Sequence, residues 1–198
     1  MTEVTVGEII HNPDSRDHFE VLGLPRRLVL DQDALSRHYY ALSRKYHPDF
    51  HQSGSAAERV ASLRRTAAVN EAHKTLRDPV ARGRWWLEFH GHRLGTNPSV
   101  PPDLAMLVFE VQEALESLRD EPEGSVRDEV RERRREVEAE STARLSALEA
   151  NFGKWDALLD GGSREPLLEE LRTLLAEISY LNTLLRDIDR TAETLEAR

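Results

Sequence analysis

The stretch Tyr46-His47-Pro48-Asp49-Phe50 is the most informative part of this sequence for predicting the fold. Before it, apolar residues recur at helical spacing and predict a helix with one narrow core stripe. The stripe consists of Leu35, Tyr39, Leu42 and Tyr46. Because proline lacks a backbone N–H and restricts the residue before it, we expect this helix to end at the proline. The turn would then hold His47 and Asp49 rigidly at the tip of a helical hairpin.

The face opposite this stripe is basic. Arg37 and Arg44 lie on it, with Lys45 at its flank, and no acidic residue occurs between Asp33 and Asp49. Exposed helices usually mix charges of both signs and so gain ion pairs between residues three or four apart. A face of a single sign gives up those pairs, which favours an acidic partner. A solvated face without a partner is the alternative.

Helix signals extend along nearly the whole chain and predict an all-α fold. Aromatic residues make up 6% of the sequence and runs of β-branched residues are scarce, which argues against a β-rich fold. Three prolines and two glycines between Gly91 and Pro102 mark a linker. The helices after it are joined by short turns and predict a small antiparallel bundle. We expect helices at residues 17–22, 31–46, 55–77, 78–91, 102–120, 125–159 and 163–198.

Charge is unevenly distributed over the 198 residues, whose net charge is −9. Residues 17–90 hold 12 basic and 9 acidic side chains, whereas residues 103–198 hold 13 and 24. Two parts of opposite sign suggest two domains with different partners. We therefore expect an N-terminal extension, a first domain with a bridging fourth helix, a linker and a three-helix domain. Their bounds are 1–16, 17–91, 92–102 and 103–198.

The composition excludes several classes of protein. There is no cysteine, so disulfides, thiolate metal sites and a cysteine nucleophile are excluded. No apolar run approaches the roughly 20 residues that cross a bilayer, and no secretory signal is visible at the N-terminus. The acidic balance argues against nucleic-acid binding. We expect a cytoplasmic protein without cofactor or metal, and with neither nucleic acid nor a membrane as partner.

Four motifs carry a resemblance to a known family. They are Asp17 to Pro25, Tyr46 to Phe50, Asp78 to Gly83 and Leu87 to Gly91. Together they resemble the HscB family, the J-domain co-chaperones of iron–sulfur cluster assembly, and the resemblance covers residues 17–118. It implies an L-shaped molecule with an N-terminal J-domain, whose His-Pro-Asp (HPD) motif lies in the hairpin loop, and a C-terminal three-helix bundle. The chain departs from the family at His51 and His73, where aromatic residues are common.

The resemblance implies a protein that is not an enzyme and has two partners. Such a co-chaperone stimulates the ATPase of a 70-kDa heat-shock-class chaperone, of the HscA or DnaK type, and delivers an IscU-type iron–sulfur scaffold protein to it. Some relatives carry a zinc module with paired cysteines, which are missing here, so no metal is implied. The expected chaperone-binding residues are Arg37, Arg44, Lys45, His47, Pro48 and Asp49.

The three-helix domain carries the expected scaffold-binding surface. On its first helix, Met106 and Phe109 lie opposite a core stripe that runs from Leu104 to Leu118, and two glutamates rim them. On its last helix, Tyr180 lies about 140° from the core stripe at 100° per residue. That stripe consists of Leu167, Leu171, Leu174, Ile178, Leu181 and Leu185. The matching family positions imply a scaffold-binding patch of Ala105, Met106, Phe109, Glu110, Glu113 and Tyr180.

Two other functions remain open. One is a J-domain adaptor for a different client, and the other is a hydrolase that uses His47 and Asp49 as an acid–base pair. The hydrolase lacks a nearby nucleophile and a third orienting group, and the tip of a hairpin is convex. A metal site that adds His51 lacks a completing ligand. The tryptophans are expected to pack in the core or between domains; they are Trp85, Trp86 and Trp155.

Overall fold

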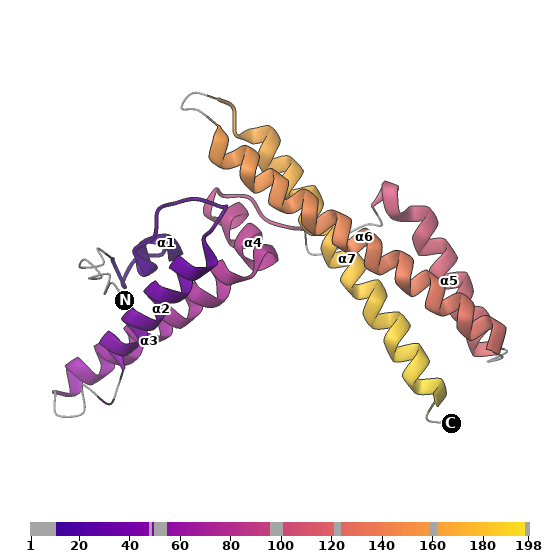
Figure 1. Ribbon diagram of the computed structural model, residues 1–198, viewed down its shortest axis with the longest axis horizontal. Coiled ribbons are helices and arrows are strands. Elements are labelled where there is room, and N and C mark those ends of the chain that lie inside the picture. Colours follow the sequence, from indigo (N-terminus) through magenta and orange to yellow (C-terminus); the bar gives the residue numbers. More distant parts are fainter. Residues whose placement is uncertain are drawn as a thin grey trace, which may run out of the picture. The chain divides into compact units, whose positions relative to one another are not determined.

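The computed structural model describes residues 11–47, 49, 55–95, 101–120, 124–158 and 162–196. In these ranges every regular element is a helix, as Figure 1 shows. The predicted all-α fold class is therefore confirmed. The chain divides into two compact units, Met1–Trp85 and Trp86–Arg198.

The N-terminal unit is built around a helical hairpin. Its arms are α2 (Gln32–Tyr46) and α3 (Ala56–Arg77), which pack along each other, and the short α1 (His18–Leu22) packs against both. α4 (Pro79–Phe89) begins in this unit and ends in the next one. α2 ends at Tyr46, as the sequence predicts, and His47 and Asp49 follow it.

Side-chain caps begin these helices where the sequence predicts. The Asp31 carboxylate accepts the backbone N–H groups of the first turn of α2. Ser55 and Glu58 form a reciprocal capping box at the start of α3. Asp17 caps α1, which ends at Gly23 in the left-handed conformation (φ 65°) that glycine adopts at little cost. These local signals fix the ends of the hairpin arms.

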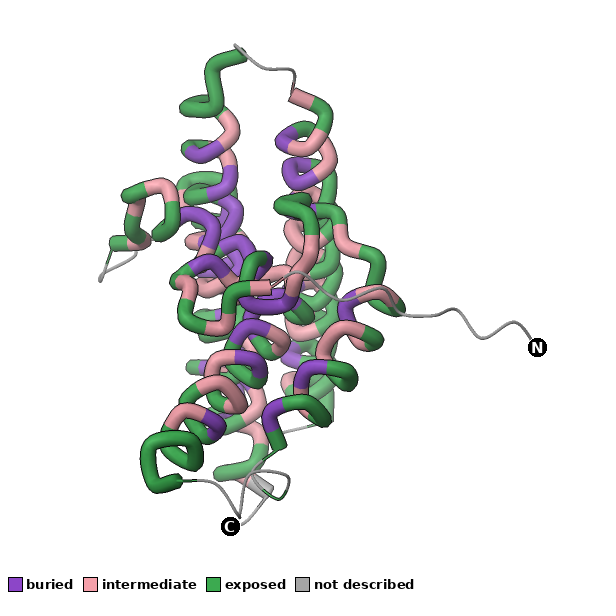
Figure 2. Tube along the Cα trace, turned by 90° about the vertical axis from the view of Figure 1, so that its left-hand side faces the viewer, coloured by how far each residue is buried: buried purple, intermediate pink, exposed green. Residues whose placement is uncertain are grey.

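The core of the N-terminal unit lies where its three helices meet. Buried positions recur at intervals along the helices in Figure 2. The predicted stripe of α2 is buried except for Tyr39, which is half-buried and stacks on His73 of α3 with ring centroids 4.0 Å apart. The histidine thus fills the place of an aromatic. The fully buried side chains of this core include Phe19, Leu22, Leu28, Leu35, Leu42 and Leu76.

The C-terminal unit is a three-helix bundle. A short 3-10 turn, η2 (Pro102–Leu104), leads into α5 (Ala105–Asp120), which packs against both α6 (Gly124–Ala157) and α7 (Glu165–Glu196). The two long helices pack along each other (Figure 1). The predicted core stripe on α5 is buried except for Leu107, which is partly buried. The core that it shares with α6 and α7 includes Leu104, Val111, Leu115, Val130, Val137 and Leu181.

The core face of α7 is broader than predicted, and Tyr180 belongs to its edge. Leu167 and Leu185 are only partly buried, whereas Leu168, Leu175, Leu184 and Ile188 are buried as well. Because α7 packs against both other helices, it buries two adjoining faces rather than one stripe. Tyr180 is half-buried and packs against the core shared by the three helices. The expectation that it points about 140° away from the core was therefore wrong.

The tryptophans are structural within each unit. Trp85 packs in the N-terminal unit on His18 and Phe19, with ring centroids 4.7 and 5.7 Å away. Trp86 packs in the C-terminal unit edge-on against Trp155, at 5.4 Å between centroids. Both rings of that pair are buried, at 4% and 7% exposure. The prediction that these rings serve packing is consistent with these contacts.

Candidate functional site

The turn after α2 presents two polar side chains that face each other. The Asp49 N–H donates to His47 Nδ1 at 3.3 Å, and the Asp49 carboxylate lies 3.5 Å from the same nitrogen. Both side chains are exposed, at 52% and 70%. Two residues of the predicted turn, Pro48 and His51, lie outside the described residues.

The chain immediately before this turn is tied to α3. Tyr46 is buried, and its backbone carbonyl accepts the hydroxyls of Ser62 and Thr66, each at 2.7 Å. Carbonyls in the last turn of a helix have no partner inside the helix, so these hydroxyls replace water there. The Tyr46 hydroxyl also lies 2.5 Å from His11 Nε2. His47 thus leaves a backbone that is held on two sides. Sequence reasoning missed the two hydroxyl residues.

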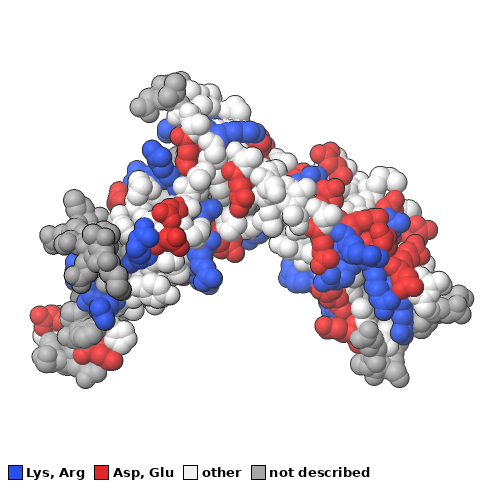
Figure 3. All heavy atoms as spheres, viewed as in Figure 1, with Lys and Arg blue, Asp and Glu red and all other residues white. Residues whose placement is uncertain are grey.

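The predicted basic face of α2 is exposed. Arg37, Arg44 and Lys45 all reach solvent, and Arg37 lies 3.9 Å from Asp31 in an exposed pair that contributes little. In Figure 3, acidic and basic side chains are interspersed over the C-terminal bundle. The face of α2 instead keeps the single sign that the sequence indicates. These cations are placed to attract an acidic surface from a distance.

A broad, open hollow of about 640 Å³ lies beside the HPD turn. All of its lining residues come from α2 and the turn after it, so it is a shallow depression on one side of the hairpin rather than an enclosed pocket. Tyr40 lines the hollow and is 70% exposed, although sequence reasoning had not singled it out. An exposed aromatic beside a guanidinium and an imidazole is typical of protein-binding surfaces. The lining residues are Tyr40, Ala41, Ser43, Arg44, His47 and Asp49.

The lining of this hollow includes Ser43, a hydroxyl residue that sequence reasoning missed. A hydrolase would need this hydroxyl within hydrogen-bond reach of His47. The Ser43 Oγ is buried and has no hydrogen-bond partner among the described residues. The geometry therefore does not engage this hydroxyl with an imidazole base.

The exposed apolar residues of α5 lie as predicted. Met106 is 71% and Phe109 63% exposed, three residues apart on one side of the helix. Ala105 and Glu113 are exposed beside them. Glu110 is half-buried because its carboxylate accepts from Arg133 of α6 at 3.0 Å. The bundle therefore presents an apolar pair with one outward carboxylate, while the second carboxylate is part of an internal ion pair.

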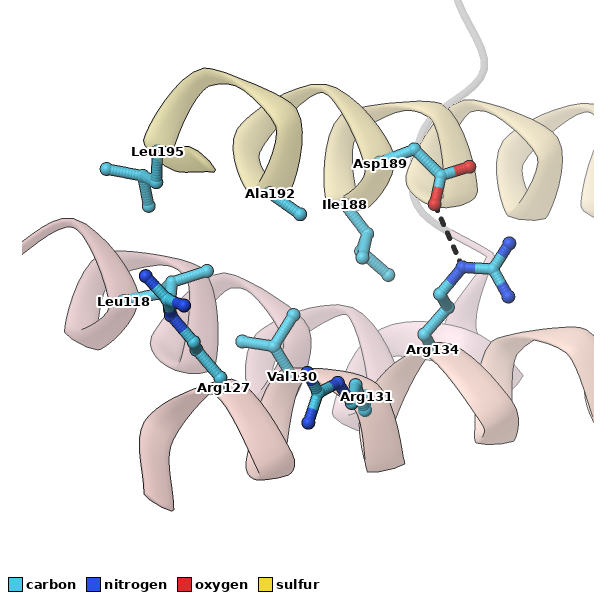
Figure 4. A pocket seen from close by; sticks show the side chains of 9 residues that line it. All are labelled: Leu118, Arg127, Val130, Arg131, Arg134, Ile188, Asp189, Ala192 and Leu195. Atoms are coloured by element: carbon cyan, nitrogen blue, oxygen red, sulfur yellow. Dashed lines mark hydrogen bonds and ion pairs between the residues drawn. The ribbon is translucent and has the colours of Figure 1, made fainter. Parts of the chain in front are cut away.

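A small cavity of about 90 Å³ lies at one end of the bundle (Figure 4). Apolar side chains of all three helices line it, among them Leu118, Val130 and Ile188. At its rim Arg134 donates to Asp189 at 2.9 Å, the pair joined by a dashed line in Figure 4. The pair bridges α6 and α7, so this rim serves the packing of the bundle.

Metal and membrane sites find no support in the described part of the chain. No group of three or more histidine, aspartate or glutamate side chains is placed there to hold a metal ion. None of the helices in those ranges is both long and apolar enough to span a bilayer.

Comparison with known proteins identifies the architecture. Residues 17–85 match the DnaJ domain family. The chain is similar in structure to the chaperone HscB from Vibrio cholerae, with a TM-score of 0.66 and 23% identity over 90% of this chain and 99% of that one. It is also similar to human co-chaperone protein HscB, with a TM-score of 0.67 and 24% identity over 90% and 83% of the two chains. The J-domain and the HscB fold predicted from the sequence are confirmed.

Proposed function

We propose, from a chain that carries a J-domain within an HscB fold, that this protein is a co-chaperone which stimulates the ATPase of a 70-kDa heat-shock-class chaperone. The partner would be of the HscA or DnaK type. The HPD turn carries this proposal: an exposed imidazole and carboxylate stand on a backbone anchored by Ser62 and Thr66. Polar groups that are already held rigidly lose little conformational entropy when they bind.

The basic face of α2 would guide the chaperone to this turn. Exposed charges act mainly on the rate of encounter, whereas polar contacts at the centre of an interface act on dissociation. Arg37, Arg44 and Lys45 fit the first role, and His47 and Asp49 fit the second. Tyr40 lines the same hollow as Arg44, His47 and Asp49 and would supply apolar contact area. Pro48, which is outside the described residues, would fix the turn.

We propose that the second partner is an IscU-type iron–sulfur scaffold protein, which binds the α5 surface. Met106 and Phe109 form an exposed apolar pair of the kind that anchors protein interfaces. Ala105 provides a flat edge, and Glu113 would select a basic rim on the scaffold. Glu110 and Tyr180 are tied into the bundle, so they would support the patch rather than reach out from it. The cluster would travel with the scaffold as cargo.

A J-domain adaptor for a different client is the remaining alternative, and it shares the chaperone half of this proposal. The hydrolase is disfavoured by the Ser43 hydroxyl, which does not bond to the imidazole. We therefore propose a protein that is not an enzyme and works in the cytoplasm without nucleic acid or membrane as partner.

The test is the steady-state ATP turnover of a purified HscA-type or DnaK-type chaperone. It is measured with this chain alone, with an IscU-type scaffold alone, and with both. If one chain brings both partners together, the combined stimulation exceeds the sum of the separate ones. No stimulation by the chain would refute the co-chaperone function. Stimulation by the chain with no further effect of the scaffold would instead favour a different client.

A further inference from the structure

The first half of α3 carries an exposed apolar groove that the proposed function does not use. Val60 is 48% and Leu63 56% exposed, although both are large apolar side chains. The groove beside them has a volume of about 530 Å³. Its lining, called the α3 groove below, consists of Asp14, Ala56, Ala57, Val60, Ala61, Arg64 and Arg65. A contiguous apolar surface with a polar rim is typical of an interaction site.

The rim of the α3 groove is mainly basic. Arg64 is exposed, and the Arg65 guanidinium lies 5.6 Å from the centroid of the Tyr46 ring. The carboxylate in the lining belongs to Asp14, which comes from the segment before α1 rather than from α3. An occupant that combines apolar side chains with carboxylates and has no cations would match this groove.

The chain itself enters the N-terminal unit beside this groove. His11 lies 2.5 Å from the Tyr46 hydroxyl through its Nε2, and the Asn12 N–H donates to the Glu20 carbonyl at 2.9 Å. Residues 11–14 are therefore held between α1 and the groove. Whatever precedes His11 starts next to Arg65 and Asp14, so its local concentration at the groove is high.

Residues 1–10 have the composition that the groove requires. They lie outside the described residues, and their sequence holds five apolar side chains, two glutamates and no lysine or arginine. The apolar residues are Met1, Val4, Val6, Ile9 and Ile10. Ten residues reach up to about 34 Å when extended. The groove covers ten residues of α3, which is roughly 15 Å along a helix. The segment is long enough to follow it from end to end.

We propose that residues 1–10 bind in the α3 groove, with their apolar side chains on Val60 and its neighbouring alanines and with Glu3 and Glu8 towards Arg64 and Arg65. The bound segment covers the α3 side of the hairpin, next to the residues that anchor the HPD turn. This inference does not depend on the identity of either proposed partner, because it concerns contacts within one chain.

The absence of cysteine from the sequence makes a direct test possible. A nitroxide label is attached to a single cysteine introduced by Thr2→Cys, and the paramagnetic relaxation of backbone amides is measured by NMR in the full chain. We expect strong broadening of amides in residues 56–65. In the background Val60→Ser with Leu63→Ser, broadening in α3 falls at least about fivefold. The matched control is Val29→Ser, which changes another exposed valine of the same unit and leaves the broadening intact.

Charge and oligomeric state separate this occupant from others. Arg64→Glu should weaken the broadening, and so should added salt, because exposed charges are screened within about 8 Å at physiological ionic strength. Unchanged α3 amides in the labelled chain would overturn the proposal. It is also overturned if broadening in α3 arises only between labelled and unlabelled copies in a mixed sample, since a second copy is then the occupant. If the label broadens no amides in α3 and the variant Val60→Ser with Leu63→Ser binds the chaperone more weakly, the groove belongs to the chaperone instead.

Discussion

Truncating Met106 and Phe109, the exposed apolar pair on α5, should affect scaffold binding much more than the stability of the fold. The double variant Met106→Ala with Phe109→Ala removes two side chains of which only about a third is buried, because the residues are 71% and 63% exposed. A covered side chain of this size buries about 150–250 Å². At about 25 cal/mol per Å², the loss in free energy of unfolding is at most about 1–2 kcal/mol per residue. The higher helix propensity of alanine offsets about 0.5 kcal/mol of this loss. By contrast, Leu115→Ala, at 1% exposure, should cost about 2–5 kcal/mol.

Binding should show the opposite order. Covering the exposed two thirds of both side chains would stabilise a complex by several kcal/mol on the same scale, of which only a part appears as affinity. We expect the double variant to bind an IscU-type scaffold about ten- to a hundredfold more weakly, at about 1.4 kcal/mol per tenfold change. The assays are calorimetric titration of the scaffold and a denaturant melt of each variant. Unchanged affinity would refute the patch. If either single change, Met106→Ala or Phe109→Ala, lowers the free energy of unfolding as much as Leu115→Ala does, that side chain belongs to the core.

Three further outcomes follow from the charges. Changing Arg37 and Arg44 to glutamate should weaken the apparent affinity for the chaperone about tenfold at low salt without changing the maximal ATPase rate. An affinity of the original chain that does not depend on salt would contradict this expectation. Burial lowers the pKa of His18 and of His73 below 6.5, so the unfolded chain binds more protons than the folded one. The free energy of unfolding therefore decreases as pH falls through about 6.5. Denaturant melts at several pH values should show a smaller pH dependence when both histidines are changed to phenylalanine. Glu177 is 6% exposed and its carboxylate lies 2.8 Å from Arg144 of α6, so the change Glu177→Gln should lower the free energy of unfolding by about 1–3 kcal/mol. A loss below about 0.5 kcal/mol in a denaturant melt would refute a structural role for the pair.

Local signals made most of the fold predictable from the sequence. The end of α2 follows from one proline, the starts of α2 and α3 follow from Asp31 and Ser55, and the outward pair on α5 follows from helical spacing. Each of these features depends on residues that are close together in the chain. The same signals placed His47 and Asp49 in an exposed turn.

The features that sequence reasoning missed depend on how helices pack. Ser62 and Thr66 anchor the Tyr46 carbonyl from 16 and 20 residues away, and only the register of α3 against α2 brings them there. Tyr180 was misplaced because one narrow stripe was assumed for a helix that packs on two neighbours. Tyr40 was overlooked because the pattern sorted α2 into an apolar and a basic face, and an exposed aromatic fits neither.

The most direct test of the central claim is the ATP turnover of the partner chaperone with the His47→Gln variant. The side chain is 52% exposed, so we expect the thermal midpoint of the variant to match that of the original chain while stimulation of turnover falls at least about tenfold. Asn12→Gln, a matched polar change away from the turn, should leave stimulation intact. Full stimulation by the His47 variant, at an unchanged thermal midpoint, would contradict the account.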